Sequence, residues 1–419
     1  MTRKSRALVD LEVYQEAAHL YEIVKDKTEE LKTDLSVIYR ESGSIHESLE
    51  DIPGALACYN LSLEMLPDKI TKDVSGRTIA MKAMTTLYKA NMTSIMGKEE
   101  EANALFREAI DLANASDHKT CRKVLGVASM NIAISLSRAG KLEEALEAYD
   151  KAIKINKKVV GEHKLKDMIN ILLLCYTNKG VALKAHGQID LSLQHFAKSQ
   201  SLAEKLVHVD HQTEHEYHLA VIYLNQTGIY YRLKEDPVTA LDYADKALKI
   251  LEKYVVEEDR WEASSTLVHM YALKLEILRG QDKLNDALYL NSRSIDMVQT
   301  LIERSGGFDL IEYQVENYSH RGEIMMMMDH WEGALPAFTR CEELARRACE
   351  KLNIENCRWQ MHMARGKMVV VLDKLGRHDE ALELRPKAIK GLKTSVDMDN
   401  LDDWFTKKTI ELIDQLESI

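Results

Sequence analysis

Four histidines near the middle of the chain form its densest group of possible metal ligands. His208, His211, His215 and His218 follow one another at steps of three, four and three residues, so on one continuous helix they would share a face. Histidines four residues apart can bind one zinc ion. Residues 215–218 read H-E-Y-H, one residue short of the zinc-protease spacing H-E-x-x-H. A metal-dependent enzyme centred on His208–His218 is therefore kept as an alternative to a solvated linker that leads into a helix.

No other motif points to catalysis or to a cofactor. The chain lacks the phosphate-binding pattern G-x-x-x-x-G-K-S/T, the nucleophile pattern G-x-S-x-G and a dinucleotide-binding G-x-G-x-x-G after a strand. Its six cysteines include no C-x-x-C pair, and several fall on apolar helix faces. We expect reduced and mostly buried thiols, no cofactor, no resident metal and no enzymatic activity.

The stretch from residue 126 to residue 160 shows which elements must position any functional side chain. Its first half mixes Val127 and Ile132 with small residues, which favours a helix packed closely on others. Gly140 then supplies the left-handed backbone that a helix C-terminus needs. From Ala145 onwards, apolar residues recur at steps of three and four, as on one face of a second helix. The stretch therefore predicts two helices joined at a tight turn.

The small residue near the start of that second helix recurs along the whole chain. Most neighbouring copies are 47 residues apart, and the spacing ranges from 38 to 48. Two helices filling about 47 residues must each run to roughly 18–20 residues, near 30 Å. Proline and glycine, which destabilise helices, are scarce, with 5 prolines and 18 glycines, and this also favours a helical chain. The copies are Ala17, Ala55, Ala102, Ala145, Ser192, Ala240, Ala287, Ala334 and Ala381.

The second copy illustrates the expected local boundaries. We predict its first helix at Leu31–Glu41 and a longer loop at Ser42–Asp51. Asp51 can cap the following helix, and Pro53 suits the first turn of that helix.

The 126–160 stretch resembles the tetratricopeptide repeat. The family pattern has small residues in the first helix, a glycine at the turn, and alanine, an aromatic residue and alanine in the second helix. Here these positions hold Ala133, Gly140, Ala145, Tyr149 and Ala152. The period near 47 exceeds the usual 34 of this family. The resemblance is therefore to its long-helix members, such as kinesin light chains, Pins-type adaptors and Rap-type peptide receptors.

This resemblance implies an all-α fold, a right-handed superhelical solenoid of about eight helical hairpins with terminal caps. We divide the chain into an N-terminal capping helix or partial repeat at 1–30, a solenoid at 31–395 and a C-terminal capping helix at 396–419.

The resemblance also implies a groove lined by the first helix of each pair. In the family, the sixth position of that helix often reaches into the groove, and here it holds Asn131, Asn178 and Gln226. A carboxamide offers both a donor and an acceptor, so a row of them can grip an extended main chain. The alternative is that these are simply polar residues on a hydrated inner face.

A second row lies up to two turns further along the same helices. It consists of Arg138, Lys184, Arg232 and Arg279, again one per repeat. These cations could form a basic ladder for an acidic peptide or protein. They could equally be ordinary cations near helix C-termini, which the helix dipole favours.

Composition narrows the class of partner. The net charge of −11 argues against general nucleic-acid binding, which requires a basic face. We read no signal peptide and no apolar run long enough for a membrane span, so we expect a cytoplasmic protein with no membrane partner.

The function that these observations favour is a non-enzymatic scaffold or adaptor that binds a peptide or protein segment in its groove. A peptide-gated regulator like the Rap-type receptors is the alternative. That family adds an N-terminal helical effector domain, and roughly 30 residues before the second repeat are few for one.

Overall fold

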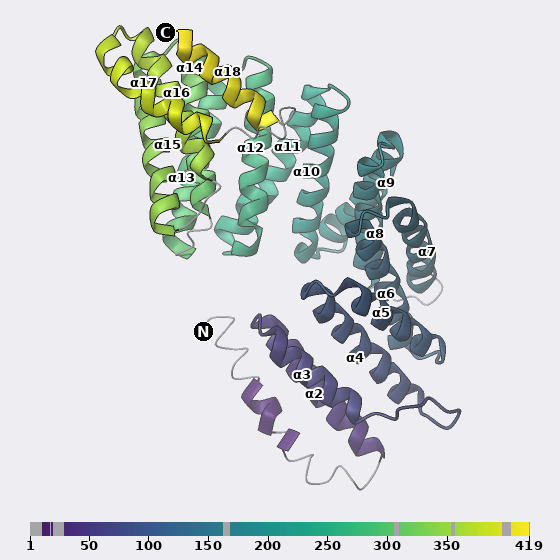
Figure 1. The fold of residues 1–419 in the computed structure, drawn as a ribbon. Helices are drawn as coiled ribbons and strands as arrows, with labels where there is room; N and C mark the ends of the chain where they lie inside the picture. Colours follow the sequence, from purple (N-terminus) through teal and green to yellow (C-terminus); the bar gives the residue numbers. More distant parts are fainter. Residues whose placement is uncertain are drawn as a thin grey trace. The chain divides into compact units, whose positions relative to one another are not determined.

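The computed structural model describes residues 11–16, 18–19, 29–161, 168–305, 310–352, 357–395 and 404–418 (Figure 1). These residues form helices joined by turns and loops, and none of them lies in a strand. The chain divides into two compact halves, Met1–Gln212 and Thr213–Ile419. The predicted all-α fold is confirmed. The predicted N-terminal cap falls mostly outside the described residues and stays a prediction.

The N-terminal half contains four consecutive helix pairs among its described residues. In each pair the two helices pack on one another, and the first helix also contacts the first helix of the next pair. We call these first helices the inner helices. The pairs are α2 (Glu29–Ser48) with α3 (Ile52–Glu64), α4 (Gly76–Ile95) with α5 (Glu99–Asn114), α6 (Lys119–Arg138) with α7 (Leu142–Gly161), and α8 (Ile169–Ala185) with α9 (Ile189–Glu204).

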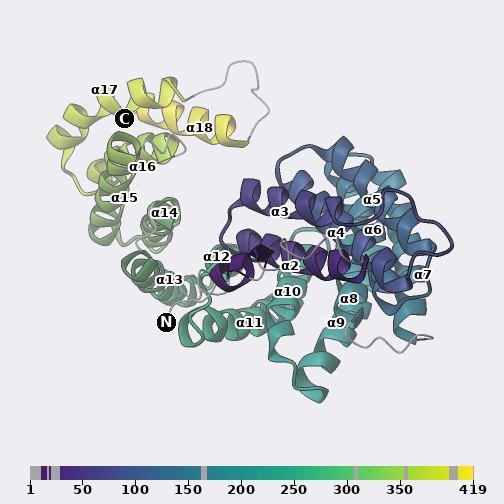
Figure 2. The ribbon, with the colours of Figure 1, turned by 90° about the horizontal axis from the view of Figure 1, so that it is seen from below.

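The C-terminal half repeats the same arrangement and ends in a single helix. Its inner helices are α10, α12, α14 and α16, and Figure 2 shows α14 and α16 nearly end-on. The elements are α10 (Glu216–Arg232), α11 (Pro237–Glu252), α12 (Ser264–Gly280), α13 (Leu284–Ser305), α14 (Ile311–Met327), α15 (Trp331–Leu352), α16 (Cys357–Lys374), α17 (His378–Lys393) and α18 (Trp404–Ser418). The described residues thus contain the eight predicted hairpins.

Helix α18 packs on α16 and α17, and the last two helices lie side by side in Figure 2. Leu412, Ile413 and Leu416 are buried against Val369 and Leu392. An apolar face of the last pair is thereby covered, as a helical solenoid requires. The capping role assigned to this helix stays a prediction.

One left-handed residue joins the two helices of every pair. Gly140 has a φ of 73°, as its turn position predicts. The same position is glycine in four pairs and an acidic residue in the other four. The residues are Glu50, Gly97, Gly140, Gly187, Glu235, Asp282, Asp329 and Gly376. They repeat at the same intervals as the small residue that follows them in the second helix.

That small residue is buried in all eight described pairs. It lies where the two helices of a pair cross closely. Where it is Ser192, the hydroxyl donates to the carbonyl oxygen of Gly180 at 2.7 Å. The buried polar atom is therefore satisfied, and serine replaces alanine without an orphaned group.

The predicted loop at Ser42–Asp51 is wrong. Helix α2 continues to Ser48, and only three residues separate it from α3. Gly43 lies inside the helix, where a Cβ atom would come within 2.5 Å of the Tyr59 ring. This glycine permits close packing and does not end the helix. The predicted cap is confirmed, because the Asp51 side chain accepts from the Gly54 amide at 3.0 Å.

The cysteines lie as the sequence predicts. None of the six, all of which are described, forms a disulfide, and Cys121, Cys175, Cys341 and Cys357 are buried. Burial raises the pKa of the Cys175 thiol to about 12, against the opposing effect of its hydrogen bond from Asn156. None of the described helices combines the length and apolar content needed to cross a membrane.

Candidate functional site

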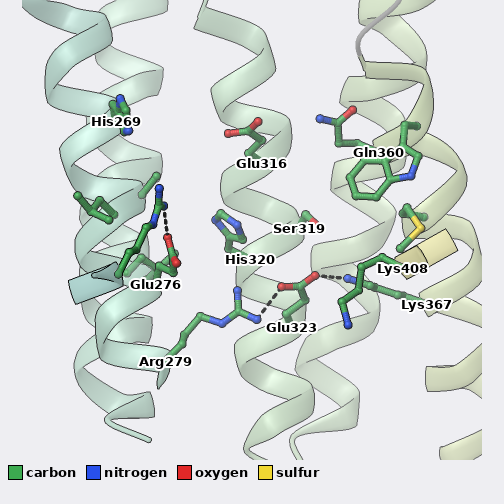
Figure 3. Close-up of a pocket in the computed structure, with 16 residues that line it drawn as sticks. His269, Glu276, Arg279, Glu316, Ser319, His320, Glu323, Gln360, Lys367 and Lys408 are labelled. Carbon is green, nitrogen blue, oxygen red and sulfur yellow. Dashed lines mark hydrogen bonds and ion pairs between the residues drawn. The ribbon is translucent and has the colours of Figure 1, made fainter. Parts of the chain in front are cut away.

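A pocket of about 1040 Å³ lies on the inner helices of the C-terminal half (Figure 3). Most of its lining comes from α12, α14 and α16, with Arg232 added by α10 and Lys408 by α18. Eleven of its sixteen lining residues carry charged or polar side chains. We call it the polar pocket.

The central group of the polar pocket is the carboxylate of Glu323. It lies between Arg279, whose guanidinium is 2.7 Å away, and Lys367, whose ammonium also donates to it (Figure 3). Burial alone would raise the pKa of Glu323, but the positive charges of Lys367 and Arg279 lower it to about 2. Glu323 is therefore ionised at neutral pH and holds three inner helices together.

Two cations share this one carboxylate, so the cluster keeps one positive charge in excess. The Nε atom of Arg279 is buried and has no acceptor among the described residues. Burial is also the main cause that lowers the pKa of His320, the neighbouring side chain on α14. The imidazole is therefore neutral at pH 7 and does not offset or add to the charge. We call Arg279, Glu323 and Lys367 the basic end of the pocket.

The opposite end of the pocket is rich in acceptors. Glu316 and Gln360 lie there, on α14 and α16 (Figure 3). Burial, with the nearby charge of Glu312, raises the pKa of Glu316, and no described residue forms an ion pair with it. The Oε1 atom of Gln360 is buried and accepts no hydrogen bond from the described residues. We call Glu316, Gln360 and the adjacent Trp359 the acidic end.

The indole of Trp359 is fixed by the last helix. Its Nε1 atom donates to Thr409 Oγ1 on α18 at 2.8 Å. The ring therefore contributes to the pocket wall with its polar atom already bonded.

Two of the residues predicted to bind a ligand, Arg232 and Arg279, are brought together in the polar pocket. Arg232 pairs with Glu276 at 2.6 Å, and both side chains are about half exposed. The predicted row of cations is thus matched by carboxylates of the chain itself. Each arginine meets a glutamate of the next inner helix, so the charges alternate in sign.

The predicted residues of the N-terminal half lie on its inner helices α6 and α8. Asn131 Nδ2 donates to Asn91 Oδ1 on α4 at 2.8 Å. Arg138 is largely exposed and lies 3.9 Å from Glu99. Asn178 and Lys184 are partly exposed. The Asn131–Asn91 contact links neighbouring inner helices by their carboxamides.

Gln226 does not reach an accessible surface. Only 3% of it is exposed, because the helices that pack on α10 cover its side chain. Its assignment as a ligand-binding residue stays a prediction.

Comparison with known proteins bears on the repeat itself. Residues 125–163 match the family model of the tetratricopeptide repeat. The chain carries a tetratricopeptide repeat. The matched segment covers most of α6 and all of α7, so it contains the stretch from which the resemblance was inferred. No curated protein matches the sequence.

Three solved structures resemble the chain in fold at low sequence identity. BtubC (BKLC) from P. vanneervenii is 15% identical over 60% of this chain and 91% of its own, with a TM-score of 0.48. Apo RapI is 14% identical over 70% of this chain and 98% of its own, with a TM-score of 0.41. The apo quorum sensor NprR from B. thuringiensis is 10% identical over 93% of this chain and 100% of its own, with a TM-score of 0.46. Likeness at this level says nothing about what the chain binds.

The histidine cluster does not share one helix face as the metal alternative requires. A π-helical turn ends at Val209, and the next helical turn begins at Thr213. His211 lies between them with a φ of 54°. The rings of His215 and His218 stack at 6.0 Å. Among the described residues, no group of three or more histidine, cysteine or carboxylate side chains is placed to hold a metal ion.

The 47-residue period of this chain could have found the pocket residues that the sequence analysis missed. Leu273, His320 and Lys367 follow Gln226 at steps of 47 residues, so they occupy the same inner position in later repeats. Glu276 and Glu323 are likewise 47 residues apart. Extending the inner position through every repeat would have placed a charged cluster on α14 and α16.

Proposed function

We propose that the chain is a non-enzymatic scaffold that binds a segment of another polypeptide in the polar pocket. The observation that carries this proposal is the pocket itself, which has a volume of about 1040 Å³ and spans successive inner helices. It contains a buried donor on Arg279 and a buried acceptor on Gln360, and no described residue forms a hydrogen bond with either atom. Orphaned buried polar atoms are costly, and a polypeptide offers a partner for each kind.

The nature of the lining favours a polypeptide over a small apolar ligand. Cations, carboxylates and an amide line the same pocket, from Arg232 on α10 to Lys408 on α18. Sites for drug-sized ligands are mostly apolar with a few polar groups. A peptide chain brings an amide and a carbonyl at every residue, which suits a pocket with polar side chains along its length.

The carboxamides of the N-terminal half form a further part of the proposal. Because Asn131 Nδ2 is used by Asn91 Oδ1, Asn131 Oδ1 and Asn91 Nδ2 are the atoms offered to a ligand main chain. Asn178 follows on the next inner helix, and Arg138 and Lys184 supply cations further along. We also propose a cytoplasmic location, because cysteines without disulfides suit a reducing compartment.

The proposal is tested by selecting peptides on the purified full chain from a phage-displayed library of random dodecapeptides. Selected peptides should bind the Arg279→Gln variant about tenfold more weakly, because a charge-assisted contact is lost. Arg340→Gln is the matched control, since Arg340 forms an exposed pair with Glu343 on the outer helix α15. Equal binding by both variants, or loss only in Arg340→Gln, would place the binding surface elsewhere.

A further inference from the structure

We infer that the polar pocket recognises a bipolar peptide segment, with a lysine or arginine at the acidic end and an aspartate or glutamate at the basic end. This inference rests on the proposed function and specifies its partner. The ligand is defined by two opposite charges held at a fixed separation within one internal stretch of another protein.

The basic end is suited to a carboxylate. Arg279 and Lys367 both contact Glu323, which neutralises only one of the two cations. A second carboxylate would balance the cluster, and the buried Nε–H of Arg279 still lacks an acceptor. Carboxylates bind arginine through charge-assisted and often bidentate hydrogen bonds, so an aspartate or glutamate side chain fits this end.

The acidic end is suited to a cation. Glu316 is a partly buried carboxylate with no described ion-pair partner, and Gln360 Oε1 is a buried acceptor without a donor. The Trp359 ring lines the same end of the pocket. A carboxylate and a carbonyl oxygen are together groups that bind an ammonium or guanidinium ion.

The helix between the two ends sets the spacing of the ligand charges. Glu316 and Glu323 are seven residues apart on α14, which is about 10 Å at 1.5 Å per residue. An extended chain advances about 3.3 Å per residue. The two ligand charges should therefore be about three residues apart, as in Lys/Arg-x-x-Asp/Glu. His320 and Ser319 lie between the ends (Figure 3).

The same two charges could come from the free ends of a very short peptide. We commit to an internal segment because the lining continues beyond the basic end. Arg232 and Glu276 continue it from the basic end toward α10, and Lys408 adds a side chain from α18. An occupant that meets this whole lining is longer than the stretch between the two charges.

The test uses mixtures of octapeptides with acetylated and amidated ends, measured by fluorescence anisotropy with the full chain. Each mixture has one fixed lysine and one fixed glutamate, one to five residues apart, in a random background without other charges. Matched mixtures replace the lysine or the glutamate by glutamine. We expect the tightest binding at a spacing of three, and about tenfold weaker binding when either charge is removed.

Protein variants assign each ligand charge to one end of the pocket. Glu316→Gln should abolish the response to the ligand lysine only, and Lys367→Gln the response to the ligand glutamate only. Glu332→Gln is the control, because Glu332 is an exposed glutamate at the start of α15 and does not line the pocket. Thermal unfolding of each variant verifies that the pocket residues are removed from a folded chain.

The possible outcomes separate the inference from the proposed function. If both pocket variants weaken the binding of every mixture equally, whatever its charges, the inference of a bipolar ligand is wrong, but the proposal that the pocket binds a polypeptide is retained. If the phage-selected peptides bind but no bipolar mixture does, the conclusion is the same. If a free tetrapeptide with uncharged side chains competes as well as the best octapeptide, the charges belong to chain ends. If neither selected peptides nor mixtures respond to pocket variants, both proposals fail.

Discussion

Arg279 on α12 contacts Glu323 on α14 at 2.7 Å, and Arg232 on α10 meets Glu276 on α12 in the same way one repeat earlier. Each arginine lies 44 residues before its glutamate. The pairs therefore link neighbouring inner helices at the same position of successive repeats. They differ in exposure, since the Arg279 pair is mostly covered and the Arg232 pair is about half exposed. Only the covered pair is expected to contribute measurably to stability.

Acidification should reveal the contribution of Glu323. Its pKa is about 2 in the folded chain, below the 4.5 of an unperturbed glutamate. A carboxyl with a lowered folded pKa stabilises the fold above its unfolded pKa, and this stability is lost as pH falls toward the folded pKa. The Glu323→Gln variant should therefore be less stable than the wild type at pH 7. The difference should shrink between about pH 4.5 and pH 2.

Urea unfolding at a series of pH values measures this difference. Glu276→Gln is the control, because its partner Arg232 is exposed and exposed ion pairs contribute about 0–1 kcal/mol. A constant gap between the wild type and Glu323→Gln from pH 7 to pH 3 would show that the carboxylate is not preferentially stabilised in the fold.

The turns between paired helices predict two opposite substitution effects. Gly140 has a φ of 73°, and Glu235 holds the equivalent position with a φ of 52°. Left-handed backbone is strained for residues with a Cβ atom, by about 1 kcal/mol. We expect Gly140→Ala to lower the free energy of unfolding by about 1 kcal/mol and Glu235→Gly to raise it by about 0.5 kcal/mol.

Chemical denaturation of both variants checks this pair of predictions. The two substitutions exchange a glycine and a residue with a side chain at one structural position, so each controls for the other. Shifts of the same sign would mean that the left-handed backbone is not what determines the stability of these turns.

The fold could be predicted from the sequence because steric requirements that recur in every helix pair restrict the residue types at two positions of the period. Gly140 and the buried small residue Ala145 meet requirements that every pair shares, a left-handed turn and a close helix crossing. The boundary predicted at Ser42 was wrong because α2 continues through Gly43, which admits the Tyr59 ring inside the helix.

The candidate site could be predicted only in part. The period placed Arg232 and Arg279 on inner helices, but it could not show that Glu276 and Glu323 neutralise them. Those partners come from the next repeat, and whether side chains meet depends on how far the pairs are rotated against each other. Gln226 is buried for the same reason, since its exposure is set by the neighbouring pairs.

The glycines inside the inner helices offer the clearest contrast in packing. Gly228 and Gly322 lie 94 residues apart, at the same position of α10 and α14 two repeats apart. A Cβ atom at Gly228 would meet nothing within 4 Å, whereas one at Gly322 would come within 2.6 Å of the Phe338 ring. Phe338 is fully buried, so the ring has no room to withdraw.

Alanine at these two positions should therefore act in opposite directions. Gly228→Ala should raise the free energy of unfolding by about 0.5–1 kcal/mol, because alanine has the higher helix propensity. Gly322→Ala should lower it by about 1–3 kcal/mol through overpacking against Phe338. The double variant Gly322→Ala with Phe338→Leu should regain part of that loss, because leucine lacks the ring atoms that the new Cβ atom meets. If Gly322→Ala alone proves as stable as Gly228→Ala in urea unfolding, the close approach of Phe338 to α14 is not what requires glycine there.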